Sequence, residues 1–360
     1  MITVHVLDQN FVLQGLIDNY ESLIWRPAYY EIGDFELYIP ANDKAVELLQ
    51  RNRYLVRDSD ITVDASGVVT YNNVMIIKNI EVTTDVEDGD YITASGRELK
   101  FILGSRIVWK MTTLSGTAEA GIRKLITDNA ISPSDKNRVI PTLTLDTALG
   151  LTDTIDKQLT GDNLAEAITE ICTTYNYGWE VYISNKALRF KLYTGLDRSY
   201  EQTDRPYVLF SDDFNNLYNT EYQMESEEYA NTTLIGGEGE GKDRKYTTVN
   251  NSNSGLNRFE VFTDARDISS NEENTTLTTA QYNKLLQERG KETLAELGIT
   301  EGFSGELKTD GNFAYREDFY LGDKVTVINK YGIAKNVMVL SAIESFSADE
   351  GEKLIPEFNI

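Results

Sequence analysis

Short runs of alternating apolar and polar residues, each with a firm beginning and end, constrain this chain most. In Phe35–Ile39 the first, third and fifth residues are Phe, Leu and Ile, separated by Glu and Tyr. A period of two places the three apolar side chains on one face of a β-strand. Gly33-Asp34 before the run is typical of a turn, and Pro40 ends it because proline cannot donate to a β-ladder. The segment therefore predicts a half-buried strand, and Ala41-Asn42-Asp43 behind it opens a short helix.

Runs of this kind fill both ends of the chain. In the first hundred residues we expect strands at Ile2–Leu7, Leu13–Ile17, Ser22–Tyr29, Phe35–Ile39, Tyr54–Val63, Val68–Val82 and Tyr91–Gly96. Farther along we expect them at Trp179–Ile183, Ala187–Tyr193, Tyr207–Ser211, Tyr218–Glu225, Asn231–Ile235, Arg258–Phe262, Phe303–Lys308, Lys324–Ile328 and Asn336–Ile343. Between about residues 106 and 200 these strands are mixed with segments of helical period.

Helix signals are fewer and lie mostly in the middle of the chain. We expect helices near Lys44–Leu49, Thr117–Asn129 and Asp162–Thr174, and from Thr278 onward. Thr117 and Asp162 are the expected N-caps of two of them. Thr278 and Gln281 form a capping-box pair at the start of the longest one.

These elements together predict a mainly β chain with an α+β insert. The first β domain is expected to cover residues 1–105 together with about 205–240. An inserted α/β domain is expected at 106–204, and a second β domain with one long helix at 241–360. At 360 residues the chain is long enough for such a division.

Charge and cysteine content exclude several classes of protein. The chain has 34 Lys and Arg against 58 Asp and Glu, a formal charge of −24, and such a surface repels the phosphates of nucleic acid. The one cysteine, Cys172, excludes an intrachain disulfide and has apolar neighbours at helical spacing, so we expect it in the core. We also expect no secretion signal and no membrane anchor, because no run approaches the roughly 18 apolar residues of a span.

No motif joins the residues that could perform catalysis. His5 is the only histidine and lies on a predicted strand, so a histidine-based triad is not expected. Asp85–Asp90 lacks the full calcium-loop pattern and predicts a hairpin loop. Gly236–Gly241 lacks the lysine and the Ser/Thr of a phosphate-binding loop and predicts a flexible turn. We therefore predict no enzyme, with no catalytic, cofactor-binding or metal-binding residues.

Four segments, taken in order, resemble the pattern of phage tail-hub proteins of the siphovirus, Tal-like group. They are the aromatic-rich N-terminal run that ends in Gly33, Phe35, Leu37, Ile39 and Pro40; Ser95–Leu99 followed by Ile107-Val108; Phe210–Leu217 with Ala230-Asn231 and Gly236–Gly241; and Leu321–Val327 with its Gly-Asp-x-Val core. The four segments follow one another in order across nearly the whole chain, which makes the match specific.

The resemblance implies a structural protein at the tip or baseplate of a virion tail, made in the host cytoplasm, from a phage or a phage-tail-like bacteriocin. In such hubs two tail-tube-like β-barrel domains per chain, with a peripheral α/β domain, form a homotrimer. The implied pseudo-sixfold ring joins the hexameric tail tube to the threefold tip. Its implied partners are a distal tail or tube protein, a tip, spike or fibre protein, and the tape-measure protein.

Glu36 and Glu81 are the residues that we expect to face the lumen of this ring, because they lie on the polar faces of predicted barrel strands. DNA is expected to pass them without specific binding. Some relatives carry a C-terminal peptidase or glycan hydrolase, and the end of the chain at Ile360 is expected to leave no room for one. Two alternatives stay open, a carboxylate-dependent cell-wall or glycan hydrolase and a plain carbohydrate-binding β module.

Overall fold

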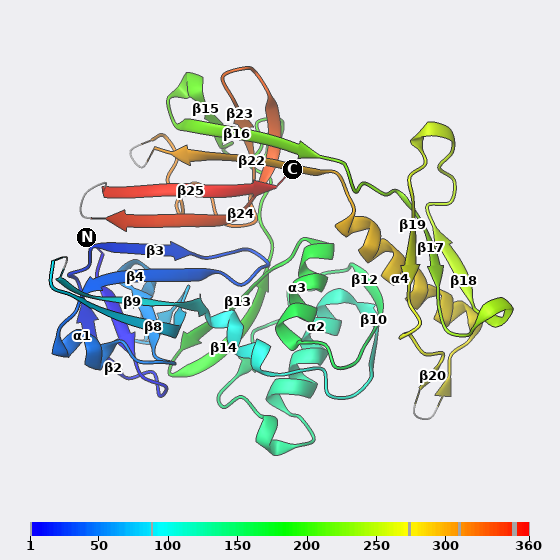
Figure 1. Ribbon diagram of the computed structural model, residues 1–360, viewed down its shortest axis with the longest axis horizontal. Helices are drawn as coiled ribbons and strands as arrows, with labels where there is room; N and C mark the ends of the chain where they lie inside the picture. Colours follow the sequence, from blue (N-terminus) through cyan, green and yellow to red (C-terminus); the bar gives the residue numbers. More distant parts are fainter. Residues whose placement is uncertain (1, 88, 273–274, 309–310, 348–350, 360) are drawn as a thin grey trace.

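The computed structural model describes residues 2–87, 89–272, 275–308, 311–347 and 351–359. Strands dominate these residues, which confirms the prediction of a mainly β chain. Figure 1 shows a large sheet built from both ends of the chain, a central region with two helices, and an outer region around the longest helix.

The large sheet has 13 strands, and its pairings are antiparallel except where β15 meets β23. In spatial order its main path runs β16 (Leu217–Glu225), β22 (Thr300–Leu307), β25 (Gly351–Asn359), β24 (Ala334–Ser347), β3 (Ser22–Arg26), β4 (Asp34–Pro40), β9 (Gly89–Glu98), β8 (Met75–Asp85), β5 (Tyr54–Arg57), β1 (Val4–Leu7) and β2 (Leu13–Ile17). On its border β15 (Leu209–Ser211) pairs with β23 (Lys324–Ile328), and β23 pairs with β24. The junction between β3 and β24 therefore joins the two ends of the chain in one sheet.

The central region combines two smaller sheets with two helices. The elements are β6 (Ile61–Val63), β7 (Val69–Tyr71), β10 (Thr112–Thr117), α2 (Ala118–Ile126), β11 (Thr144–Leu145), β12 (Thr154–Leu159), α3 (Leu164–Tyr175), β13 (Gly178–Ser184) and β14 (Ala187–Tyr193). A five-stranded sheet has the order β11-β14-β13-β7-β6, and β10 pairs with β12. Two strands from the first hundred residues thus belong to the central sheet.

The outer unit, as we call residues 232–296, is built around α4. It contains β17 (Thr232–Gly236), β18 (Tyr246–Val249), β19 (Glu260–Asp264), β20 (Asn271–Glu272), β21 (Thr275–Thr276) and α4 (Thr279–Glu296). The three longer strands form a sheet in the order β18-β17-β19. Figure 1 shows α4 lying beside this sheet, at one end of the molecule.

The apolar side chains form three separate clusters. The largest fills the central region and includes residues from both halves of the large sheet, such as Val56 of β5 and Val339 of β24. A second lies under β3, β4 and β9 and includes Trp25, Phe35 and Leu37. The third belongs to the outer unit and joins Ile235 of β17 to Tyr282 and Leu286 of α4.

The structure confirms the local strand and helix signals of the opening segment. Phe35, Leu37 and Ile39 are each 5% exposed or less, on one face of β4. The short helix α1 (Asp43–Leu48) follows, with Asn42 as its N-cap. Gly33 does not adopt a positive φ; instead a Cβ there would lie 2.0 Å from the backbone oxygen of Arg26.

Two predictions differ from the structure, one about the arrangement of the strands and one about a helix cap. The separate closed barrels are not confirmed, because the described strands pair in one open order from β16 to β2. The N-cap of α3 is Asn163 and not Asp162, since the Asn163 side chain accepts from the backbone N–H groups of Ala165 and Glu166. The capping box of Thr278 and Gln281 at the start of α4 is confirmed.

The predicted domain boundaries stay a prediction. Within 205–240, which we assigned to the first β domain, β15 pairs with β23 and β16 pairs with β22, both in the C-terminal half of the chain. None of the helices among the described residues is long and apolar enough to cross a membrane.

Candidate interaction surfaces and ion clusters

Glu36 and Glu81 lie on one exposed face of the large sheet. Glu36 of β4 stands in register with Ser95 of β9, and Glu81 of β8 stands in register with Thr93, two residues farther along. Both glutamates are exposed, on the face opposite Leu37 and its apolar neighbours. The structure therefore brings the two expected lumen residues to the same surface.

This polar sheet face continues across the junction between the two ends of the chain. Ser345 of β24 pairs with Ile24 of β3, which pairs in turn with Glu36. On the other side Ser345 pairs with Lys353 of β25. One cross-strand row therefore runs from β25 to β9 through Lys353, Ser345, Ile24, Glu36 and Ser95. We define the polar sheet face by this row and its neighbour through Thr93 and Glu81.

The segments that carry the resemblance meet in space. The carboxylate of Glu98, at the end of β9, accepts a hydrogen bond from the N–H of Gly33 at 3.0 Å. Gly96 lies against β8, where a Cβ would stand 1.9 Å from the carbonyl oxygen of Ile76. Close backbone approach at Gly33 and Gly96 explains why glycine is needed at both positions.

The Gly-Asp-x-Val segment binds residues 196–198, which follow the last strand of the central sheet, to the C-terminal half of the chain. Asp323 accepts hydrogen bonds from the N–H of Leu196 at 2.7 Å and from Arg198 Nε at 2.8 Å. Gly322 has a φ of +86°, and a Cβ there would lie 2.2 Å from the ring of Tyr29. The glycine satisfies the backbone conformation, and the aspartate anchors the crossing chain.

Four charged residues, of which Arg57 and Asp60 are buried and Arg316 and Glu344 half-buried, link the N-terminal and C-terminal halves of the large sheet. Arg57 is fully buried, and its Nε donates to Asp60 at 2.7 Å. Its Nη2 lies 2.9 Å from Glu344 of β24, an ion-pair distance without the alignment of a hydrogen bond. Arg316 Nη1 lies 2.7 Å from Asp60 and completes the cluster. We call these four residues the junction cluster; local sequence patterns contain no signal for it.

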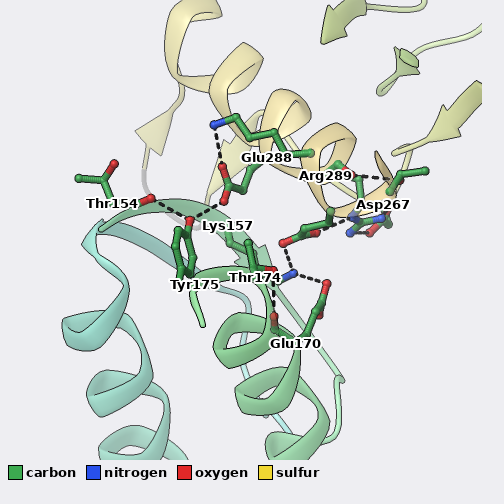
Figure 2. A network of polar contacts seen from close by, with 11 residues as sticks. Thr154, Lys157, Glu170, Thr174, Tyr175, Asp267, Glu288 and Arg289 are labelled. Carbon is green, nitrogen blue, oxygen red and sulfur yellow. Dashed lines mark hydrogen bonds and ion pairs between the residues drawn. The ribbon is translucent and has the colours of Figure 1, made fainter. Parts of the chain in front are cut away.

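A second cluster of charges joins the outer unit to the central region (Figure 2). Lys157 Nζ of β12 donates to Glu170 of α3 at 2.7 Å and also to Glu292 of α4. Beside it the hydroxyl of Tyr175 donates to Glu288 at 2.6 Å. We call these five residues the docking cluster. Burial, opposed by Lys157 and aided by Glu170, raises the pKa of Glu292 to about 7.

A groove of about 780 Å³ opens beside the docking cluster. Its wall includes Phe101 and Ala165, the carboxylates Glu170 and Glu292, and Glu296 near the end of α4. The groove gives solvent a route to the two carboxylates that share Lys157.

The structure does not bring the other chemically interesting residues together. His5 contacts Asp58 at the surface. Within the described ranges, no group of three or more His, Cys, Asp or Glu is placed to hold a metal ion. Asp85–Asp90 lies in the β8–β9 hairpin, and its Asp88 falls outside the described residues.

The glycine-rich loop Gly236–Gly241 begins the connection from β17 to β18, as predicted. The carbonyl oxygens of Gly236 and Gly237 accept hydrogen bonds from Arg244 at 2.9 and 3.1 Å. The carboxylate of Glu238 lies 2.7 Å from Lys245 Nζ. The loop thus surrounds the chain's own cations and offers no cradle for phosphate.

Comparison with known proteins supplies a family and a fold. The family model described as siphovirus ReqiPepy6 Gp37-like protein matches residues 3–358. A comparison with curated protein sequences finds no match.

Solved structures of tail proteins are similar over the full length. The tail protein from Neisseria meningitidis MC58 is 15% identical with a TM-score of 0.58, covering 100% of this chain and 96% of that one. The 43 kDa tail protein of prophage MuSo2 from Shewanella oneidensis is 11% identical with a TM-score of 0.57, covering 99% and 98%. Prophage tail protein gp18 from Listeria monocytogenes EGD-e is 13% identical with a TM-score of 0.50, covering 99% and 94%. At these identities the likeness shows a shared fold.

Proposed function

This chain belongs to the family of siphovirus ReqiPepy6 Gp37-like proteins, and from that premise we propose that it is a structural protein of the tail of a long-tailed phage or phage-tail-like particle. Three similar structures, each covered over at least 94% of its length, are described as tail proteins. We propose further that the chain is the tail hub, a homotrimeric ring between the hexameric tube and the threefold tip.

The observation that carries the hub proposal is the pairing of β24 with β3. This pairing makes one sheet from strands at both ends of the chain and gives it one continuous polar sheet face. Three copies would supply six half-sheets, which matches a sixfold tube on one side and a threefold tip on the other. The proposal therefore needs no closed barrel within a single chain.

In this proposal the polar sheet face lines the lumen, with Glu36 and Glu81 directed into it. Carboxylates repel DNA phosphates, and Ser95, Thr93 and Ser345 beside them are uncharged, so that Lys353 is the one base in the two rows that define this face. DNA and the tape-measure protein would pass without binding. The proposed neighbours are a distal tail or tube protein on one side and a tip, spike or fibre protein on the other.

Imaging of labelled particles tests the hub proposal. Glu36→Cys and Glu81→Cys, each modified with a maleimide–gold label, should place density at the inner wall of a threefold ring. Glu228→Cys, on an exposed linker outside the sheet, is the matched control and should place density away from the lumen. Labels from Glu36→Cys at the outer rim would contradict the proposed orientation.

One observation favours the alternative of a carboxylate-dependent glycan hydrolase. Glu170 and Glu292 lie together at the wall of the groove, and Glu292 has a raised pKa, as a general acid requires. Against it, Lys157 donates to both carboxylates and occupies the space between them. Incubation of the chain with purified peptidoglycan tests this alternative. Release of reducing sugars by the natural chain, and its loss in Glu292→Gln, would establish a hydrolase.

A further inference from the structure

The outer unit has its own apolar core and is tied to the body of the protein by two linkers. Its core cluster, which includes Ile235 and Leu286, is separate from the cluster that fills the central region. The chain enters the unit through residues 226–231 and leaves it through 297–299. The N–H of Ala230 donates to the carbonyl of Leu297 at 2.9 Å, so the two linkers run together.

The contact between the outer unit and the central region is polar. Lys157 of β12 meets Glu292 of α4, and Tyr175 of α3 meets Glu288. Next to them Gln158 Nε2 donates to the carbonyl of Ser269 at 3.4 Å, and its Oε1 accepts from the Ser269 N–H at 3.0 Å. A polar contact of this kind gains little from the hydrophobic effect, so its strength depends on charge and proton occupancy.

The charges in this contact do not balance around Glu292. From β12 it faces Lys157, and from α3 it faces Glu170, which shares the same ammonium group. On its own helix Arg289 lies 3.7 Å away but is held at 2.8 Å by Asp267. The neighbouring Glu288 is bound by Tyr175 and by Lys291 at 3.4 Å. The buried Glu292 therefore shares the buried ammonium group of Lys157 with Glu170, whose side chain is 41% exposed.

We propose that a proton held by the docking cluster latches the outer unit onto the central region, and that loss of this proton lets the unit undock and move on its two linkers. The groove beside α4 provides the path by which solvent exchanges the proton. The latch belongs to the isolated chain and is independent of the proposed place in a tail.

The sign and size of the effect follow from proton linkage. Burial raises the pKa of Glu292 from an ordinary value of 4.5 to about 7 in the docked state. The resulting stabilisation of docking is fully present below 4.5 and is lost as the pH rises through about 7. Between about pH 5.5 and about pH 8.5 the docking equilibrium constant should therefore fall by about 30-fold.

Thiol labelling of the native full-length chain measures this constant. A cysteine replacing Gln158, which is 8% exposed beside Ser269, should react with a thiol reagent only when the unit undocks. The replacement removes the two hydrogen bonds to Ser269 in every sample, so the test compares pH values and added variants on this one background. The rate is divided by that of a cysteine at exposed Ser134, which removes the intrinsic pH dependence of thiol reactivity. Cys172, fully buried in the core, reports global unfolding in the same sample.

We expect the normalised rate of Gln158→Cys to rise about 30-fold from about pH 5.5 to about pH 8.5. Adding Glu292→Gln, which cannot lose a proton, should abolish the rise, whereas Glu296→Gln, on the exposed last turn of α4, should leave it intact. A flat profile for Gln158→Cys alone, or a rise that persists when Glu292→Gln is added, overturns the latch. Labelling no faster than that of Cys172 also overturns it, because the unit would then not undock short of unfolding.

Discussion

Replacing Arg57 by methionine removes the central cation of the junction cluster. Its guanidinium is fully buried, donates to Asp60 at 2.7 Å, lies 2.9 Å from Glu344, and stands 5.0 Å from the ring centre of Trp25. Methionine fills a similar volume but leaves two acidic side chains with one base. The change therefore weakens the link between β5, which ends at Arg57, and β24, which carries Glu344.

The expected cost follows from the burial of the partners. Removing one member of a buried ion pair costs about 3–5 kcal/mol, and the lost contact with Trp25 adds about 0.5–2 kcal/mol. Arg316 offsets part of this loss, because it stays 2.7 Å from Asp60 and 3.6 Å from Glu344. We expect the free energy of unfolding to fall by about 3 kcal/mol, at the low end of the range.

Chemical denaturation of the full chain, followed by circular dichroism, measures the loss. Arg51→Met is the matched control, since Arg51 is exposed and its replacement should change the free energy of unfolding by less than about 0.5 kcal/mol. If Arg57→Met cost less than about 1 kcal/mol, the junction cluster would not hold the two halves together and the reasoning would fail.

Two further predictions test the local geometry by thermal or chemical denaturation. Gly33→Ala should cost about 1–3 kcal/mol, because the new Cβ would stand 2.0 Å from the Arg26 carbonyl oxygen, whereas Gly302→Ala meets no atom within 4 Å and should be mild; equal losses would refute the crowding argument. Asn163→Ala should cost about 1 kcal/mol as the true N-cap of α3. Asp162→Ala should cost clearly less, and the reverse order would restore the capping residue that the sequence suggested.

The sequence predicted those elements whose cause is local. The alternation around Phe35 and Leu37 placed both side chains correctly in the core, because a strand's two faces are set by its own period. The capping box of Thr278 and Gln281 was correct for the same reason. At α3 two adjacent capping side chains, Asp162 and Asn163, compete, and only the backbone path decides between them.

Arrangement over long separations was not predictable in this way. The pairing of β24 with β3 brings Glu344 beside Trp25, more than 300 residues away in sequence, and no periodic pattern encodes that choice of neighbour. Lys157 and Glu292 each look like solvated surface charges in the sequence. They become a buried pair only because two separately cored parts of the chain meet there.

The mass of the particle formed by the purified full chain, measured by light scattering at concentrations well above micromolar, tests the hub proposal most directly. A hub that forms the ring on its own should have three times the chain mass of 40.6 kDa. A strict monomer over the whole concentration range would contradict the trimeric ring.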